Sequence, residues 1–156
     1  MPKRSPKTGS KPVVRAKAGP ASAAPRTRPD PVVADRLRKM AMALPGTVEK
    51  LAHGEPTFRT ADRMFAMYAS PDSHHGNGRT AVWVKSTLEN QEFMIRARPD
   101  RFFVPPYVGP SGWVGMWLDR RVSWKEVAQV LADGHLLAEQ AGRRRKPAPG
   151  SRRRPR

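Results

Sequence analysis

The chain has 156 residues, no cysteine and a formal net charge of +17, with 30 Lys/Arg against 13 Asp/Glu. The length favours a single domain, and the lack of cysteine excludes disulfides and thiolate chemistry. No apolar run reaches the ~18 residues of a membrane span. We therefore expect a cytoplasmic protein that makes no membrane contact.

The charge is concentrated at the two ends of the chain. Residues 1–29 hold eight Lys/Arg and no acid, and residues 143–156 hold eight more, again without an acid. These ends are rich in Pro, Ala, Ser and Gly. They bury too little apolar surface to offset roughly 1–2 kcal/mol of backbone entropy per residue. We expect two disordered tails, 1–29 and 143–156, around one folded domain, 30–142.

A helix is expected at the start of the domain. Asp30 is placed to cap it, and Pro31 fits its first turn. Its core face is an apolar stripe at helical spacing, formed by Val33, Leu37, Met40 and Leu44. The helix ends at Pro45-Gly46, and residues 51–56 are predicted to be an irregular connection.

Three strands follow, predicted at 57–59, 64–69 and 80–85. The loop 71–78 between the second and third strands is rich in Gly, Asn and Asp, as turns require. The short connections predict an antiparallel meander.

The second half of the domain alternates again between helix and strand. Ser86 or Thr87 caps a helix whose apolar members are Leu88, Phe93 and Ile95. Strands are predicted at 101–104 and 112–118. Ser123 caps the last helix, in which Gly134 weakens the middle; its core face is formed by Val127, Val130, Leu131 and then Leu137 or Ala138.

The predicted order is α-β-β-β-α-β-β-α. Without βαβ crossovers, it indicates an α+β two-layer domain, with a five-stranded antiparallel sheet and helices on one side.

Four motifs, in this order, resemble the MmcQ/YjbR family. They are Met42-Ala-Leu-Pro-Gly-Thr-Val-Glu49, His53-Gly-Glu-Pro-Thr-Phe-Arg59, Phe65-Ala66, and Arg101-Phe-Phe-Val-Pro-Pro-Tyr-Val-Gly109 with Gly112-Trp113-Val114. The last block is the most specific, and the resemblance covers residues 35–140. The family is described as DNA-binding, through a double-wing arrangement in an α+β fold similar to secretion chaperones. The resemblance implies that fold and a non-enzymatic DNA-binding role; the basic tails lie outside it.

The stretch 101–119 holds two Phe, two Trp and one Tyr. Trp113 and Trp117 lie four apart in an extended segment, so they point to the same face. Core packing is the favoured interpretation because aromatic rings dominate small cores, and a base- or ligand-stacking surface is the alternative. Tyr107, in a Pro-Pro-Tyr loop, is the first candidate for an exposed ring.

The histidines give no metal-binding pattern. His74 and His75 are adjacent, His53 and His135 are isolated, and a structural zinc site needs four ligands. We expect no metal or other cofactor, and polar loop histidines. Hydrolase, phosphate-binding and metalloprotease motifs are missing as well, so we expect no catalytic residue. An enzyme or small-ligand site near His53, Glu55 and Tyr107 stays open as an alternative.

The tails carry the strongest functional signal. Duplex DNA bears a charge about every 1.7 Å of its axis, and neutralising Z phosphates gives a salt slope near −0.9Z. We expect sequence-independent, salt-sensitive binding of nucleic acid, most simply DNA. The alternative is that the tails only solubilise the chain or attract RNA and other polyanions. The expected C-terminal contacts are Arg143, Arg144, Arg145, Lys146, Arg152, Arg153 and Arg154.

The nearly neutral middle can contact DNA only through a local patch. Candidate contacts there are Tyr107 and two basic clusters, Arg96, Arg98 and Arg101, and Arg120, Arg121 and Lys125. The alternative for both clusters is a solvated face. The alternative function is a protein-interaction module, peptide-binding or homodimeric, with the 105–109 loop at the contact.

Overall fold

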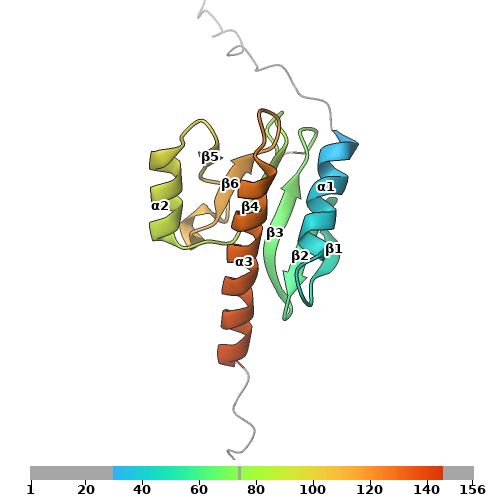
Figure 1. The fold of residues 1–156 in the computed structure, drawn as a ribbon, viewed down its shortest axis with the longest axis vertical. Helices are drawn as coiled ribbons and strands as arrows, with labels where there is room; N and C mark the ends of the chain where they lie inside the picture. The colour runs from blue at the N-terminus through green and yellow to red at the C-terminus, as the bar shows by residue number, and fades with distance from the viewer. Residues whose placement is uncertain (1–29, 74, 146–156) are drawn as a thin grey trace, which may run out of the picture.

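The computed structural model describes residues 30–73 and 75–145 (Figure 1). Three α-helices and six strands make up the domain. In chain order they are α1 Pro31–Met42, β1 Val48–Ala52, β2 Glu55–Thr60, β3 Arg63–Ala69, β4 Ala81–Val84, α2 Leu88–Ala97, β5 Phe102–Phe103, the 3-10 turn η1 Gly109–Ser111, β6 Val114–Trp117 and α3 Trp124–Arg145.

The strands form one antiparallel sheet in the order β1-β2-β3-β4-β6-β5. All three helices lie on one face of this sheet, with α3 crossing its middle between α1 and α2 (Figure 1). The α+β two-layer prediction is confirmed. The sheet has six strands, however, so the prediction of five was wrong.

The additional strand is β1, whose last two residues fall in the stretch 51–56 predicted to be irregular. Ala52 pairs with Glu55, which leaves His53 and Gly54 as a two-residue hairpin turn. Both turn residues have positive φ, 53° and 79°, as the tight primed turns between strands require. A His-Gly pair is a weaker turn signal than Asn-Gly or Asp-Gly, and this concealed the hairpin.

The main core lies between the helices and the sheet. Leu37 of α1 and Val127 and Leu131 of α3 pack against Phe58 and Phe65 of the sheet. Gly134 of α3 is buried against the sheet: a Cβ there would lie 2.5 Å from Val84 Cγ1 and 3.0 Å from the Lys85 carbonyl oxygen. This glycine therefore allows the close approach of α3 to β4.

The opposite face of the sheet carries a second, smaller apolar cluster. It contains Met67, Trp83 and Trp113, with Phe103 and Trp117 packed against it. Trp83 and Trp113 are almost fully buried. Core packing is thus confirmed for Trp113, while Phe103 and Trp117 are partly buried against this cluster.

Two expectations about helices were wrong. Leu88 and Phe93 are exposed, and the buried side chain of α2 is Gln91. The last helix continues to Arg145, so Arg143, Arg144 and Arg145 are helical and not part of a disordered tail. The remainder of both predicted tails lies outside the described residues. No helix among the described residues is long and apolar enough to cross a bilayer.

Candidate nucleic-acid interface

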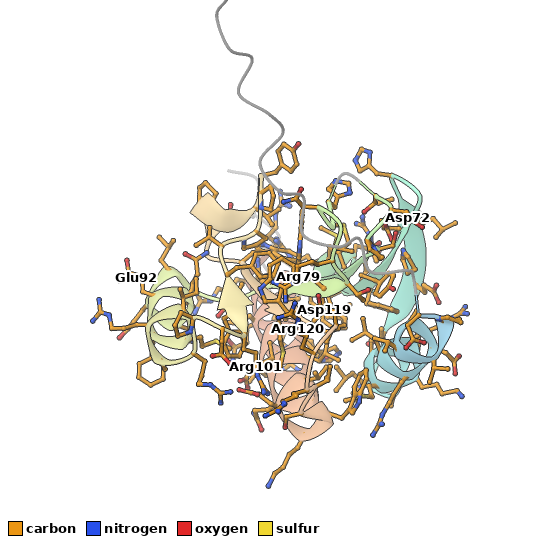
Figure 2. All side chains as sticks on the ribbon, turned by 90° about the horizontal axis from the view of Figure 1, so that it is seen from above. Asp72, Arg79, Glu92, Arg101, Asp119 and Arg120 are labelled. Atoms are coloured by element: carbon orange, nitrogen blue, oxygen red, sulfur yellow. The ribbon has the colours of Figure 1, made fainter. Side chains whose placement is uncertain are left out.

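The two predicted basic clusters of the domain meet at one end of the fold. The α2–β5 turn brings Arg98 and Arg101, and the loop from β6 to α3 brings Arg120 and Arg121. They line a cleft of about 840 Å³, which we call the arginine cleft, together with Arg79, Asp100 and Trp117. Figure 2 looks onto this end, and its labels mark Arg79, Arg101, Asp119 and Arg120 close to one another.

Arg79 is held rigidly in the wall of the cleft. Its guanidinium forms two hydrogen bonds with Asp119, of 2.7 and 2.9 Å. It also lies over the ring of Trp117, with Cζ 3.8 Å from the ring centroid. The other partner of Trp117 is Phe103, stacked at 3.9 Å between centroids. The ring of Phe103 in turn lies over Gly115, where any Cβ would meet it at 2.3 Å.

Arg101 ties the two loops of the cleft together. One of its nitrogens, Nη1, pairs with Glu126 at the start of α3, and Nη2 donates to the Arg121 carbonyl oxygen at 3.1 Å. Arg121 itself has a positive φ of 36°. A non-glycine residue in that region is strained and needs support from its surroundings, and such strain is often found at functional sites.

The cleft therefore contains arginines of two kinds. Carboxylates engage Arg79, Arg98 and Arg101, through Asp119, Asp100 and Glu126. Among the described residues no ion pair engages Arg120 or Arg121, and both are exposed. Arg120 and Arg121 are thus the two cations that can accept an anion without displacing a carboxylate, and bidentate recognition of phosphate is what a guanidinium does best.

The other predicted contact residues are distributed elsewhere. Arg96 and Lys125 are exposed but do not line the cleft. Arg143, Arg144 and Arg145 form the exposed last turn of α3, at the opposite end of that helix. Lys146, Arg152, Arg153 and Arg154 lie outside the described residues. Arg79 was not among the predicted contacts, and its only signal in the sequence was its position just before a predicted strand.

Tyr107 is exposed, as expected, at 78% of its surface. Its φ of 66° puts it in the left-handed region, so its loop must be held in place. Gln91 of α2 does this by donating to the carbonyl oxygens of Gly109 (2.9 Å) and Trp113. Gly112 packs so closely on the start of α2 that a Cβ would lie 2.8 Å from the Leu88 nitrogen.

A stacking surface made of tryptophans is not what the structure shows. Trp113 is buried, and the ring of Trp117 lies between Arg79 and Phe103. An incoming base would have to displace one of these partners. Among the rings of the 101–119 stretch, Tyr107 is the one exposed to solvent.

The expectation of polar loop histidines was wrong for His135. It lies on α3, buried, with Nε2 2.7 Å from the Pro45 carbonyl oxygen and its ring edge-on to Phe65. His75 is also buried, near the rings of His53, Trp83 and Tyr107. The described residues contain no group of three potential metal-ligating side chains.

The alternative site near His53, Glu55 and Tyr107 is brought together in part. His75 lies 5.9 Å from His53 and 6.2 Å from Tyr107 between ring centroids. The Glu55 carboxylate is buried and accepts a hydrogen bond from the Ser70 backbone N–H at 3.2 Å. That carboxylate supports the chain where β3 ends.

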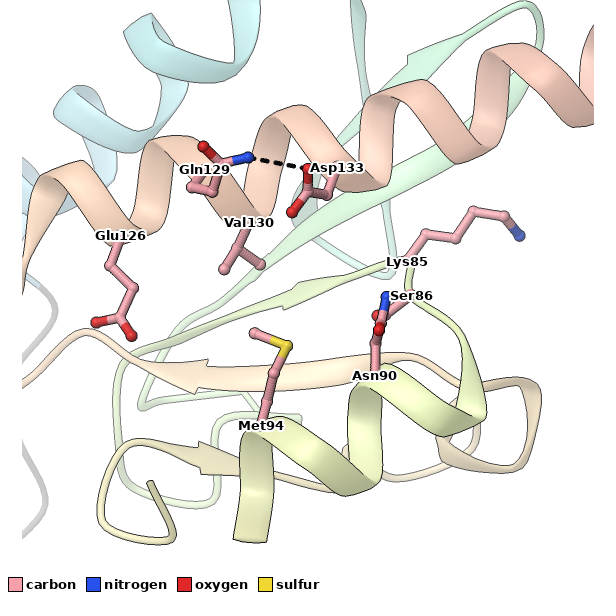
Figure 3. Close-up of a pocket in the computed structure, with 8 residues that line it drawn as sticks. All are labelled: Lys85, Ser86, Asn90, Met94, Glu126, Gln129, Val130 and Asp133. Carbon is pink, nitrogen blue, oxygen red and sulfur yellow. Dashed lines mark hydrogen bonds between the residues drawn. The ribbon is translucent and has the colours of Figure 1, made fainter. Parts of the chain in front are cut away.

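A second hollow, of about 290 Å³, lies between α2 and α3 (Figure 3). Met94 and Val130 form its apolar part, while Glu126 and Asp133 line it with carboxylates. Gln129 donates to Asp133 across one turn of α3, at 3.0 Å. With two carboxylates and one lysine, Lys85, this groove differs from the arginine cleft in charge, and its Glu126 pairs with Arg101 of the cleft.

Comparison with known proteins agrees with this architecture. The family model described as YjbR matches residues 42–137, more than half of the chain. The crystal structure of Deinococcus radiodurans protein DR2400, described with the domain DUF419, is similar with a TM-score of 0.59 and 20% sequence identity, over 77% of this chain and 84% of that one. At that identity the similarity shows a common fold. No curated protein matches the chain. From residue 42 to residue 137, and therefore through most of the folded part, this chain belongs to the YjbR family.

Proposed function

We propose that the protein is a non-enzymatic DNA-binding protein whose arginine cleft holds backbone phosphate and whose basic tails add sequence-independent attraction. The observation that carries the proposal is the convergence of Arg98, Arg101, Arg120 and Arg121 from two separate loops around one cleft. Random solvated cations have no reason to face one another, because their repulsion favours separation.

The presence of both paired and exposed arginines in the cleft supports phosphate as the ligand. Arg79 and Arg101 are fixed by carboxylates and make the walls rigid. Arg120 and Arg121 remain exposed at the rim. A preorganised wall with two open guanidinium groups binds an anion with little loss of side-chain entropy.

The tails extend this attraction over a longer distance. The 16 Lys/Arg in residues 1–29 and 143–156 have no acid among them. Each phosphate that such a side chain neutralises steepens the dependence of affinity on salt. The cleft then fixes how the domain sits on the backbone, whereas the tails set most of the affinity.

Anisotropy titrations with a fluorescent DNA duplex at several salt concentrations test this proposal. The double variant Arg120→Gln/Arg121→Gln should bind about tenfold more weakly, and its salt slope should be shallower by about two. The matched control is Arg38→Gln/Lys39→Gln, which removes the same charge from α1. These side chains are already paired with Glu49 and Asp35, so the control should bind as the wild type does.

Two results would count against the proposal. If the cleft variant and the α1 control bind equally, the cleft is not the contact and only the tails attract DNA. If the wild-type chain binds no duplex at low salt, the DNA-binding role itself is wrong.

A second candidate function rests on Tyr107. Its exposed ring, held at a strained φ by Gln91 and Gly112, suits a protein contact, because exposed tyrosines are enriched at interfaces. Sedimentation of the wild type and Tyr107→Ala tests a homodimer through this loop. The control Phe93→Ala removes an equally exposed ring from α2, and only the tyrosine variant should lose the dimer.

A further inference from the structure

Two further cations lie on the face of the sheet that carries no helices. They border a hollow of about 240 Å³, just below the ~300–1,000 Å³ of pockets for drug-sized ligands. The hollow lies where the paired strands β1 and β2 meet the β2–β3 turn, and it is lined by Gly46, Val48, Lys50, Arg59, Ala61 and Asp62. Its size suits a small molecule or the end of a chain.

Strand pairing brings the two cations to this face. Phe58 packs in the core between the helices and the sheet, so the next residue, Arg59, points to the opposite face. Val48 pairs directly with Arg59, and Lys50 lies two residues further along β1, on the same face. The register of β2 against β3 shifts between Phe58 and Arg59, and such bulges often occur beside functional sites because they redirect side chains.

Arg59 has a buried donor that needs an acceptor. Its Nε is buried and forms no hydrogen bond within residues 30–73 and 75–145. Buried polar groups are nearly always paired, and an unpaired donor on a charged group is especially costly. Lys50 is exposed, and no described residue forms an ion pair with it. An oxyanion in the hollow could accept from Nε and the adjacent Nη of Arg59 at once, the two-point contact that guanidinium groups favour.

Asp62 indicates which kind of anion fits. Ala61 and Asp62 form the two-residue turn between Thr60 and Arg63, with φ of 48° and 62°, and aspartate is common in such turns. With two cations and this carboxylate, the lining has a net charge of +1, and Asp62 repels a dianion more than a monoanion. Val48 and Ala61 add apolar surface. The hollow therefore suits a carboxylate on a short apolar stem better than a phosphate.

The hollow is far from the arginine cleft. Ala61 packs against α3 near its end, where a Cβ at Gly142 would lie 2.8 Å from the Ala61 Cβ, whereas Arg121 comes just before the start of α3. At 1.5 Å per residue, about 27 Å of helix separates residues 124 and 142. In Figure 1 the β2–β3 turn lies at the lower end of the sheet, and the loop from β6 to α3 lies at the upper end. Ligands of the two sites therefore do not compete.

We propose that this hollow binds a carboxylate. Arg59 holds the two carboxylate oxygens, Lys50 adds a second positive charge, and Val48 contacts the stem of the ligand. A small organic acid and the free C-terminus of a peptide both present this group. The site does not depend on the DNA binding proposed above.

NMR of the full-length protein tests the site through the Arg59 Nε–Hε signal, which is identified by its loss in Arg59→Lys. Sodium propionate is titrated against sodium chloride at constant ionic strength. The signal should move and reach saturation, together with the backbone amide signals of Ala61 and Asp62. Followed through those amides, Arg59→Lys should bind propionate about tenfold more weakly, because it keeps the charge but loses the two-point contact.

Two further variants separate the site from general effects. Lys50→Gln changes an exposed side chain and should weaken binding by about threefold, as expected for a partly screened charge. The matched control Arg38→Lys makes the same change as Arg59→Lys on the helix-bearing face, where Arg38 pairs with Glu49. It should bind propionate as the wild type does.

Other probes test the chemistry of the ligand. Inorganic phosphate should bind more weakly than propionate, and Asp62→Asn should remove that difference, because asparagine suits the turn but carries no charge. Acetyl-Ala-Ala-Ala with a free C-terminus is the second carboxylate probe. Saturation with either carboxylate supports the site, and the tighter probe identifies the source of the group.

Three results would overturn the inference. Neither carboxylate moves the Arg59 signal, Arg59→Lys and Arg38→Lys bind propionate equally, or wild-type protein prefers phosphate. A DNA duplex that moves the Arg59 signal and binds Arg59→Lys more weakly would overturn it as well, since the hollow would then be a contact for backbone phosphate. Failure of duplex binding alone would remove the DNA-binding function and leave this site intact.

Discussion

Arg79 and Asp119, forty residues apart in the chain, share a two-point salt bridge of 2.7 Å (Nε to Oδ2) and 2.9 Å (Nη2 to Oδ1). The carboxylate is almost fully buried, with 4% of its side chain exposed, against 28% for Arg79. Because the arginine also covers the ring of Trp117, this pair joins the β3–β4 loop to the end of β6. It fixes one wall of the arginine cleft.

Asp119→Asn should therefore lower the free energy of unfolding by about 2–3 kcal/mol. Removing one partner of a buried ion pair leaves an uncompensated charge, which costs about 3–5 kcal/mol when both groups are fully buried. Partial exposure of Arg79 reduces that cost here. Urea denaturation followed by tryptophan fluorescence measures the change.

Asp100→Asn is the matched control for this prediction. Its partner Arg98 lies 3.4 Å away, and 71% of the carboxylate side chain is exposed. Exposed pairs contribute at most about 1 kcal/mol, so this variant should unfold nearly as the wild type does. Equal losses for Asp100→Asn and Asp119→Asn would show that the buried bridge has no special role.

For Gly134→Ala, helix propensity and packing change the free energy of unfolding in opposite directions. Alanine is the better helix former by about 1 kcal/mol, so sequence alone suggests stabilisation. The structure places the new methyl 2.5 Å from Val84 Cγ1 and 3.0 Å from the Lys85 carbonyl oxygen. The backbone oxygen cannot move aside easily, and overpacking costs about 1–3 kcal/mol. We expect a lower midpoint in urea.

The double variant Gly134→Ala/Val84→Ala tests whether the clash with Val84 causes this loss of stability. Truncating Val84 removes the nearest clash but leaves the contact with the Lys85 carbonyl. The loss in the double variant should therefore be smaller than the sum of the two single losses, as expected for residues in contact. Strict additivity would contradict the proposed clash.

The sequence predicted the parts of the fold that depend on local pattern. The stripe through Leu37 and the cap at Asp30 placed α1, where Asp30 accepts from the Val32 N–H. Prediction from the sequence failed where long-range contacts determine which side chains are buried. The role of Gln91 depends on two carbonyls 18 and 22 residues away, and no periodicity reveals that a polar side chain will be the buried one.

For the candidate site, too, local features were predictable and long-range contacts were not. Arg98, Arg101, Arg120 and Arg121 were visible as two basic clusters, because each cluster is local in sequence. That they share one cleft depends on antiparallel pairing of β5 with β6, which brings the α2–β5 turn beside the loop that follows β6. Arg79 could not be identified, since its partners Asp119 and Trp117 lie about forty residues further along the chain.

Gln91→Ala tests how the Tyr107 loop is held. The substitution removes the Gln91 donor from both carbonyls. The Gly109 carbonyl keeps the Gly112 N–H at 2.9 Å, whereas the Trp113 carbonyl loses its side-chain donor, and a buried unsatisfied group costs about 1–3 kcal/mol. We expect a loss of about 2–3 kcal/mol in urea. Gln129→Ala is the control, because that side chain is exposed and bonds only to Asp133; its effect should stay within about 0.5 kcal/mol.

Tyr68 gives the domain a specific sensitivity to alkali. Burial raises the pKa of Tyr68 above its ordinary value of 10.0, and the negative charge of Glu55 raises it further. The unfolded chain therefore loses this proton first. The stability that Tyr68 contributes is fully present below about pH 10 and is lost as the pH rises through the raised pKa of the folded state.

The two tyrosines of the chain allow this to be measured directly. In a titration of tyrosinate absorbance, Tyr107→Phe leaves Tyr68 as the chain's one tyrosine, and its step should lie above pH 10. This variant should also keep the fall of stability in alkali that Tyr68→Phe removes. A step at pH 10 or below would mean that the Tyr68 hydroxyl reaches water in the folded protein, against its burial in the core between the helices and the sheet.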